Sequence, residues 1–354
     1  MSRLPLNRTE PCWLAIRLPH LALDLHTRGQ RERKTAVAVS ATVDRRERII
    51  DCNPAALSGG VRPGMSVQAA RAVLDELCLV ERDSAAERQA LERLAAWCYQ
   101  YSSQVCIPAD RTGLLLEAGA SRRLFGAPEQ LARRLQGELG RLGYPAQTGS
   151  APTPEAAWLA AWESRHMPAH AQPRQELGAL PLERLHLDGA RIQAMQRMGF
   201  RQLRDLFRLP RRALTRRFGP DLPDYLDRLL GITPDPRTFY QPPERFSSHL
   251  DLPAEIHACQ ALLFPLRRLL GELCGVLRGG DSAVQSLQVI LGHEDHADSV
   301  LDLGLQSPSQ DLDRLMTVLR ERLERLRLPQ AVRGIRVEAP QLLKFSAGQG
   351  SLFH

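Results

Sequence analysis

The feature that most constrains the fold is the segment 113–126, in which a short apolar run ends in one acidic residue. Three consecutive leucines form a run of the length expected for a buried strand, and Glu117 follows them directly. Phosphoryl transfer with two metal ions needs several carboxylates in one cleft, because each Mg²⁺ binds hard oxygen ligands. Thr112 and Gly113, where this strand begins, supply no carboxylate. The segment therefore predicts a core strand with an incomplete set of metal ligands.

Strand and helix patterns alternate from residue 11 to residue 167, which is typical of an α+β or α/β domain. Apolar or alternating runs predict strands at 12–18, 35–40, 48–52, 78–80, 104–107, 113–117 and 146–150. Helical periodicity predicts helices at 22–27, 67–77, 84–99, 128–142 and 154–163. Asn53 and Pro54 fit the cap and the first turn of a further short helix. Both classes stay open from this pattern alone.

Two proline-containing linkers, at 168–174 and 233–246, divide the rest of the chain. Between them the pattern is helical in short pieces, predicted at 175–188, 189–198, 201–206, 211–218 and 222–230. After the second linker, strands are predicted at 247–252, 283–291, 299–304 and 332–338, and helices at 258–277 and 312–325. The resulting order β-α-β-β-α-β is the split βαβ pattern of a small ferredoxin-like domain.

The chain is basic, with a formal net charge of +7 and an isoelectric point near 9.3. Nine arginines lie between residues 191 and 217, where the only acid is Asp205. Arginine matches the geometry of phosphate, so this segment predicts contact with a nucleic-acid backbone. The residues expected to bind DNA are Arg201, Arg204, Arg208, Arg211, Arg212, Arg216 and Arg217. The alternative is a solvated surface in an arginine-rich protein.

The seven cysteines contain no CxxC pair, and most lie in apolar runs, as expected for buried thiols in a reducing compartment. The first eleven residues are polar, unlike a signal peptide, and no apolar run reaches the roughly 18 residues that a membrane span needs. We therefore expect a cytoplasmic protein. The run 293–296 (HEDH) falls at a predicted hairpin tip, where charged residues are common, so neither a metal site nor a cofactor is predicted.

Taken in order, several segments resemble the Y-family (translesion) DNA polymerases, over nearly the whole chain. Residues 13–26 resemble the first palm strand and helix, 49–66 (IIDCNPAALSGGVRPGMS) the fingers, and 113–126 (GLLLEAGASRRLFG) the second catalytic strand. Residues 198–219 (MGFRQLRDLFRLPRRALTRRFG) resemble the small thumb, and the last segment resembles the little finger. The resemblance implies an α+β fold with a ferredoxin-like palm at 1–170 and fingers inserted in it at about 28–76. It further implies a helical thumb at 171–235, a β-α-β-β-α-β little finger at 236–342 and a flexible tail at 343–354.

The same resemblance implies that the family's metal ligands are missing. The acid of the first strand falls on Arg17 and a second nearby acid falls on Pro19. The Asp-Glu pair of the second strand falls on Thr112 and Gly113. A cationic Arg17 cannot ligate Mg²⁺, and without the metals the charge of the transferring phosphoryl group is not neutralised. We expect a polymerase fold without polymerase activity.

The family residues that hold the incoming nucleotide are also replaced in this chain. The finger Tyr and Arg that hold the incoming triphosphate fall on Pro54 and Leu57, and a Lys near the last palm helix falls on Trp158. Inactive members of this family are thought to act as adaptors in bacterial mutasomes, during damage-induced (SOS) mutagenesis. The resemblance implies binding to DNA, to the β sliding clamp and to ImuA. It also implies recruitment of an error-prone C-family DNA polymerase for translesion synthesis, at the nucleoid.

The last residues of the chain fit this adaptor interpretation. Residues 349–353 (QGSLF) resemble the bacterial clamp-binding pentapeptide, which has Gln, then a small or acidic residue, then Leu and Phe. Leu352 and Phe353 would insert into a preformed apolar pocket, while Gln349 bonds to its rim and Ser351 takes the small position. We predict that these residues bind the clamp.

Two other functions stay open from the sequence. An active translesion polymerase with rearranged ligands needs acids such as Asp24, Asp110 and Glu117 in one cleft. A protein–protein scaffold without a DNA role predicts that charge reversal at Arg211, Arg212, Arg216 and Arg217 leaves DNA affinity unchanged.

Overall fold

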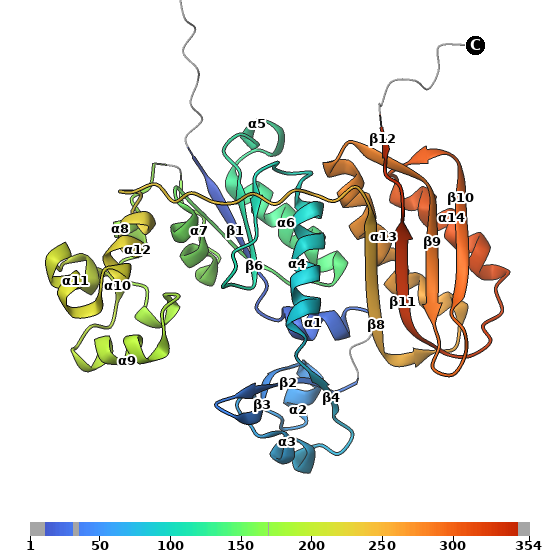
Figure 1. Ribbon diagram of the computed structural model, residues 1–354, viewed down its shortest axis with the longest axis horizontal. Helices are drawn as coiled ribbons and strands as arrows, with labels where there is room; N and C mark the ends of the chain where they lie inside the picture. Colours follow the sequence, from blue (N-terminus) through green and yellow to red (C-terminus); the bar gives the residue numbers. More distant parts are fainter. Residues whose placement is uncertain (1–10, 31–34, 169, 346–354) are drawn as a thin grey trace, which may run out of the picture. The chain divides into compact units, whose positions relative to one another are not determined.

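The computed structural model describes residues 11–30, 35–168 and 170–345, and the chain divides into two compact units (Figure 1). The first unit contains the described residues up to Pro19, together with 104–137 and 146–239. The second contains the described residues of 20–103, 138–145 and those from Tyr240 onward. The predicted boundaries of palm, fingers, thumb and little finger are finer than this division and stay predictions.

A four-stranded sheet with the order β5-β6-β1-β7 organises the first unit. Its neighbouring strands are antiparallel, and they are β5 (Val105–Cys106), β6 (Gly113–Glu117), β1 (Trp13–Arg17) and β7 (Gln147–Ala151). The central residues of β1, 14–16, are all apolar, and this suits a strand that lies between two others and is fully buried there. The same unit contains α5 (Arg122–Phe125), the first part of α6 (Pro128–Leu142) and α7 (Pro154–Ala160).

Short helices complete the first unit after α7. They are α8 (Pro173–Glu176), α9 (Gly189–Arg197), α10 (Leu203–Phe207), α11 (Arg211–Phe218) and α12 (Asp221–Leu229), with 3₁₀ turns η1 (Ala161–Glu163) and η2 (Leu182–Arg184). The predicted helix at 175–188 is wrong, because only the end of α8 and the turn η2 lie there. Pro181 has no N–H to donate, which prevents a continuous helix through this segment. The apolar faces of these helices share one core cluster with α7.

The second unit begins with a small three-stranded sheet in the order β3-β2-β4. The strands of this sheet are β2 (Val37–Val43), β3 (Arg46–Cys52) and β4 (Cys78–Glu81). The helices in this part of the unit are α1 (Leu21–Thr27), α2 (Pro54–Ser58), α3 (Val67–Val73) and α4 (Ser84–Cys98). The predicted cap of α2 is confirmed, because the Asn53 side chain accepts a hydrogen bond from the Ala56 N–H (2.9 Å). A compact apolar cluster that includes Ile49 and Val61 fills this sheet's core.

The C-terminal part of the second unit has the predicted order β-α-β-β-α-β. Its elements are β8 (Phe246–Ile256), α13 (Leu263–Gly279), β9 (Ser282–Gly292), β10 (Ser299–Ser309), α14 (Leu312–Glu324) and β11 (Val332–Ala339). A 3₁₀ turn η3 (Cys259–Leu262) precedes α13, and a short strand β12 (Leu343–Lys344) pairs with β9. The sheet order β10-β9-β11-β8 places β11 between β8 and β9 with antiparallel pairing, so the split βαβ pattern is confirmed. The two helices pack on one face of this sheet (Figure 1).

Candidate functional site

Pairing of β1 with β6 brings the predicted metal-site positions together. Arg17 lies opposite Gly113, and Trp13 lies opposite Glu117 at the other end of the strands. The Leu18 N–H donates a hydrogen bond to the Thr112 carbonyl (3.1 Å), which extends the pairing by one step. Three of the positions that the family resemblance assigns to acids, Arg17, Thr112 and Gly113, therefore adjoin one another in the first unit.

Arg17 is buried at this point and its guanidinium faces aromatic rings. Its side chain donates to the Gln147 carboxamide oxygen (2.7 Å), and its central carbon lies 3.2 Å from the centroid of the Trp162 ring. The guanidinium of Arg184 lies over the same ring at 4.2 Å. Burial, and secondarily the charge of Arg184, lower the pKa of Arg17 to about 10, so Arg17 remains a cation at neutral pH.

Gly113 and Trp158 occupy the space next to Arg17. A Cβ added at Gly113 would overlap the Ile16 carbonyl oxygen and would lie 3.0 Å from Cη2 of Trp158. The backbone there has a φ of +153°, which side chains rarely adopt. The Trp158 ring is also faced by the guanidinium groups of Arg17 (5.7 Å) and Arg111 (5.4 Å). Aromatic and cationic groups thus surround the positions that the family resemblance assigns to acidic metal ligands.

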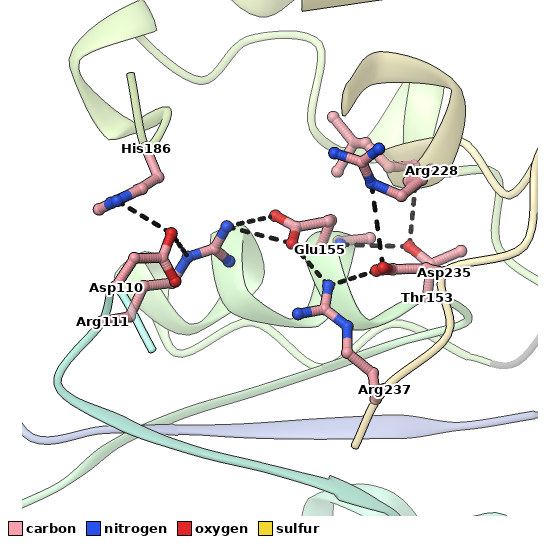
Figure 2. A network of polar contacts seen from close by, with 10 residues as sticks. Asp110, Arg111, Thr153, Glu155, His186, Arg228, Asp235 and Arg237 are labelled. Carbon is pink, nitrogen blue, oxygen red and sulfur yellow. Dashed lines mark hydrogen bonds and ion pairs between the residues drawn. The ribbon is translucent and has the colours of Figure 1, made fainter. Parts of the chain in front are cut away.

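A polar network adjoins this cluster in the same unit (Figure 2). Arg111 donates to both carboxylate oxygens of Glu155 (3.1 and 2.8 Å), and Arg237 donates to the same carboxylate (2.7 Å). Burial alone would lower the pKa of Arg237, but hydrogen bonds to Asp235 and Glu155 raise it. Asp110 completes the network with ion pairs to Arg111 (3.6 Å) and His186 (3.0 Å). The carboxylates are therefore matched by arginines.

Glu117, the single acid of the segment 113–126, binds backbone N–H groups close to it. Its carboxylate accepts hydrogen bonds from the N–H groups of Cys12 (3.3 Å) and Gly119 (2.9 Å), and so orders the turn after β6. Within the residues that the structure describes, no group of three or more His, Cys, Asp or Glu side chains is placed to hold a metal ion. At the hairpin tip, His293 bonds the Ala331 carbonyl oxygen and the Ser299 hydroxyl with its two ring nitrogens.

The arginines predicted to bind DNA are all exposed and lie on or beside α10 and α11. Arg211 differs from the others because it forms ion pairs with Asp224 and Asp227 of α12. Asp205, the only acid of the segment, accepts hydrogen bonds from the N–H groups of Arg201 and Gln202 (both 3.0 Å). These backbone hydrogen bonds lower the pKa of Asp205 and hold its charge at the start of α10.

The remaining predicted positions are placed as follows. Pro54 and Leu57 lie on α2, where Pro54 is the first helical residue and Leu57 is partly exposed. The proposed clamp-binding residues, Gln349, Ser351, Leu352 and Phe353, lie outside the described residues. Within the part of the chain that the structure describes, no helix is long and apolar enough to cross a membrane.

Two central residues of the cluster were missed by sequence reasoning. Trp162 lies four residues after Trp158, a spacing that puts both rings toward one side of a helix, and this was the available signal. Glu155 was missed because an acid in the first turn of a helix is usually explained by the helix dipole alone.

Comparisons with known proteins match the chain to one family model and to two relatives. Residues 26–162 match the model of the IMS (impB/mucB/samB) family. The chain is 28% identical over 296 residues to Protein ImuB from two strains of Caulobacter vibrioides. That match covers 83% of this chain and 64% of those proteins, so the chain spans less than two thirds of their length.

Solved structures with a similar fold are Y-family DNA polymerases. An insertion ternary complex of Dbh DNA polymerase has a TM-score of 0.52 at 16% identity, covering 94% of this chain and 99% of that one. DinB from Sulfolobus solfataricus has a TM-score of 0.51 at 16% identity, covering 95% and 100%. The predicted fold class is confirmed by this likeness. The chain therefore has a Y-family polymerase-like fold, matches the impB/mucB/samB family model at residues 26–162, and is similar in sequence to Protein ImuB.

Proposed function

We propose that this chain is a non-catalytic, polymerase-like adaptor in DNA-damage-induced mutagenesis. It would bind DNA and the β sliding clamp, and it would recruit an error-prone C-family polymerase for translesion synthesis. ImuA would be a further partner. The proposal rests on the similarity to Protein ImuB, on the polymerase-like fold and on the residues at the positions that the family resemblance assigns to metal-binding acids.

The observation that carries the proposal is the buried guanidinium of Arg17. It occupies the strand position opposite Gly113, stacked on Trp162 and bonded to Gln147. A divalent cation would be repelled by this charge, and the guanidinium donates to the carboxamide oxygen of Gln147 rather than to a carboxylate. Two-metal catalysis at this place is therefore not supported by the groups present.

The expected DNA contact is electrostatic. Arg204, Arg208, Arg212, Arg216 and Arg217 are exposed around α10 and α11, where guanidinium groups can reach phosphates without displacing core contacts. Each phosphate contact releases condensed counterions, so affinity should fall steeply as salt concentration rises. A flat salt dependence would remove DNA from the proposal and leave a protein–protein scaffold.

Primer extension with Mg²⁺ or Mn²⁺ tests the missing chemistry. We expect no extension above a polymerase-free control, while an active Y-family polymerase extends the same primer. Extension by this chain would mean that the assignment of Arg17, Thr112 and Gly113 to the metal site is wrong. The active polymerase with rearranged ligands would then replace the adaptor.

A clamp titration run beside it tests the recruitment role. Substituting Leu352→Ala and Phe353→Ala together should abolish clamp binding, because these side chains are expected to fill the clamp's apolar pocket. His354→Ala is the matched control, one residue beyond the pentapeptide, and it should bind as the unmodified chain does. Equal affinity for the double variant and the control would move the clamp contact elsewhere.

A further inference from the structure

The second unit contains an interface between α13 of the β-α-β-β-α-β module and earlier parts of the chain. Three glycines spaced four residues apart, Gly271, Gly275 and Gly279, lie along α13. A Cβ added at Gly275 would overlap the Trp97 ring, and one added at Gly279 would lie 2.7 Å from the Tyr99 Cβ. Bare helix backbone thus receives the large side chains at the end of α4.

The third glycine of the row shows the same close fit. A Cβ at Gly271 would lie 3.0 Å from a methyl carbon of Leu142, at the end of α6. Trp97 is 1% exposed, and the helix that carries it, α4, packs against α13. Removing so much apolar surface from water is the main favourable contribution to an interface of this kind.

A buried ion pair crosses the same interface. Arg28, directly after α1, and Glu272 of α13 form an ion pair in which both side chains are almost completely buried. Glu272 also accepts a hydrogen bond from the Ser248 hydroxyl of β8 (2.6 Å), and the Arg28 guanidinium lies 4.6 Å from the centroid of the Tyr144 ring. Arg93 of α4 also lies 3.8 Å from the Glu272 carboxylate. A buried pair of this kind fixes the register of the two surfaces, because sliding would separate Arg28 from Glu272.

Polar contacts at the margin hold the same two parts of the chain. The Tyr99 hydroxyl donates to the Tyr240 carbonyl (2.5 Å), and Arg278 donates to the Gln100 side chain (3.1 Å). Arg268 donates to the Arg141 carbonyl at the end of α6 (3.2 Å). Helix α1 also contacts β8. The interface therefore has an apolar centre, a paired charge and a hydrogen-bonded rim, as a permanent interface has.

We infer that the module formed by residues 246–344 is docked permanently on α1, α4 and the end of α6, and moves with them as one body. Domains joined by a polar linker move relative to one another by default, unless their interface is large and apolar. Residues 233–245 contain no helix or strand and would by themselves permit such motion. The tryptophan seated on Gly275 and the buried ion pair are what prevents it. This inference is independent of the proposed adaptor function.

Cutting the linker after folding tests the inference. A protease site is inserted between Pro243 and Glu244, the purified full chain is cut, and the product is passed over a sizing column in about 1 M NaCl. Salt at this level screens surface charges but leaves an apolar interface intact. We expect the two fragments to co-elute at the position of the uncut chain. Separate elution would overturn the inference.

A matched pair of variants then locates the contact. Gly275→Leu places its Cβ where the Trp97 ring lies, whereas the Cβ of Gly140→Leu in α6 meets no atom within 4 Å. After cutting, Gly275→Leu should weaken fragment association at least about tenfold, and Gly140→Leu should not change it. Equal association of both variants would show that α13 and α4 do not hold the fragments together. The co-elution test on the cut unmodified chain does not depend on these variants, so the inference stays testable even if one variant folds poorly.

Discussion

The two units each bury an arginine and each press a tryptophan against a glycine, but with opposite electrostatics. In the second unit, Arg28 is paired with Glu272, and although burial opposes it, the carboxylate raises the pKa of Arg28. In the first unit, Arg17 faces Trp162 and an amide, and burial lowers its pKa. The direction of the pKa shift therefore reports whether a counter-charge was buried together with the arginine.

This contrast separates two uses of a buried cation. Arg28 and Glu272 hold two surfaces in register, and removing either residue takes away the nearest counter-charge of the other. Without Arg28, Glu272 would retain a longer contact with Arg93 (3.8 Å). Arg17 bonds to the neutral amide of Gln147, so its removal leaves no unpaired charge at that amide. Its guanidinium instead occupies the strand end opposite Gly113, where aromatic rings can stabilise a cation but a metal ion would be repelled.

The largest effect is expected from giving both arginines the same substitution. Arg28→Met leaves the Glu272 carboxylate buried without its main partner and should lower the free energy of unfolding by about 3–5 kcal/mol. Arg17→Met loses stacking on Trp162 but strands no carboxylate, so the loss should stay below about 2 kcal/mol. Urea unfolding of the two variants gives both values. Equal losses would mean that the two sites do not differ as described.

The second test concerns the glycine of the first unit. A Cβ at Gly113 would overlap backbone, the Ile16 carbonyl, which cannot rotate away as a side chain can. Gly113→Ala should therefore lower the free energy of unfolding by about 2–3 kcal/mol. Gly140→Ala is the control, since a Cβ there meets open space and alanine favours a helix by up to about 1 kcal/mol. A tolerated Gly113→Ala would show that the strand can shift to admit side chains, including acids.

A smaller effect distinguishes exposed arginines from ion-paired ones. Arg212→Gln should weaken DNA binding several-fold and reduce the salt slope of binding by about one unit, because one phosphate contact is lost. Arg211→Gln is the matched control, since Arg211 is already held by Asp224 and Asp227. It should leave the salt slope unchanged and instead lower the thermal stability of the first unit. The reverse result would assign the phosphate contact to Arg211.

The smallest expected effect is on the pH dependence of the second unit. Burial lowers the pKa of His26 below its ordinary value of 6.5, against the opposing charges of Asp251 and Asp83. The unfolded chain therefore binds this proton more readily, so stability present above about pH 6.5 is lost as the pH falls. Unfolding curves between about pH 7.5 and pH 5.5 should show this slope, and His26→Gln should flatten it. An unchanged slope would place the titrating group elsewhere.

Periodicity and turn residues were enough to predict most of the elements. Helix α4, the cap at Asn53 and the β-α-β-β-α-β order follow from apolar spacing and capping chemistry, which are local. The helix predicted at 175–188 was wrong, because Pro181 has no N–H to donate and interrupts a helix at that point. Local patterns therefore gave reliable elements wherever no proline interrupted them.

The candidate site was predictable only in part. Family resemblance placed Arg17 and Gly113 at related positions, and the strand register brings them together. It did not indicate that Trp162 would stack on Arg17, or that α12 would supply the carboxylates that engage Arg211. These contacts join residues far apart in the sequence, and their energies depend on burial, which a single sequence does not reveal.

The tryptophan seated on α13 also makes the protein its own optical probe. Of the four tryptophans, only Trp97 belongs to the sequence of the second unit, since Trp13, Trp158 and Trp162 belong to the first. Replacing those three with phenylalanine would leave a single indole whose emission wavelength depends on whether the helix backbone of α13 still covers it. Undocking of the C-terminal module would then appear as a red shift in fluorescence, at concentrations and speeds that chromatography cannot reach.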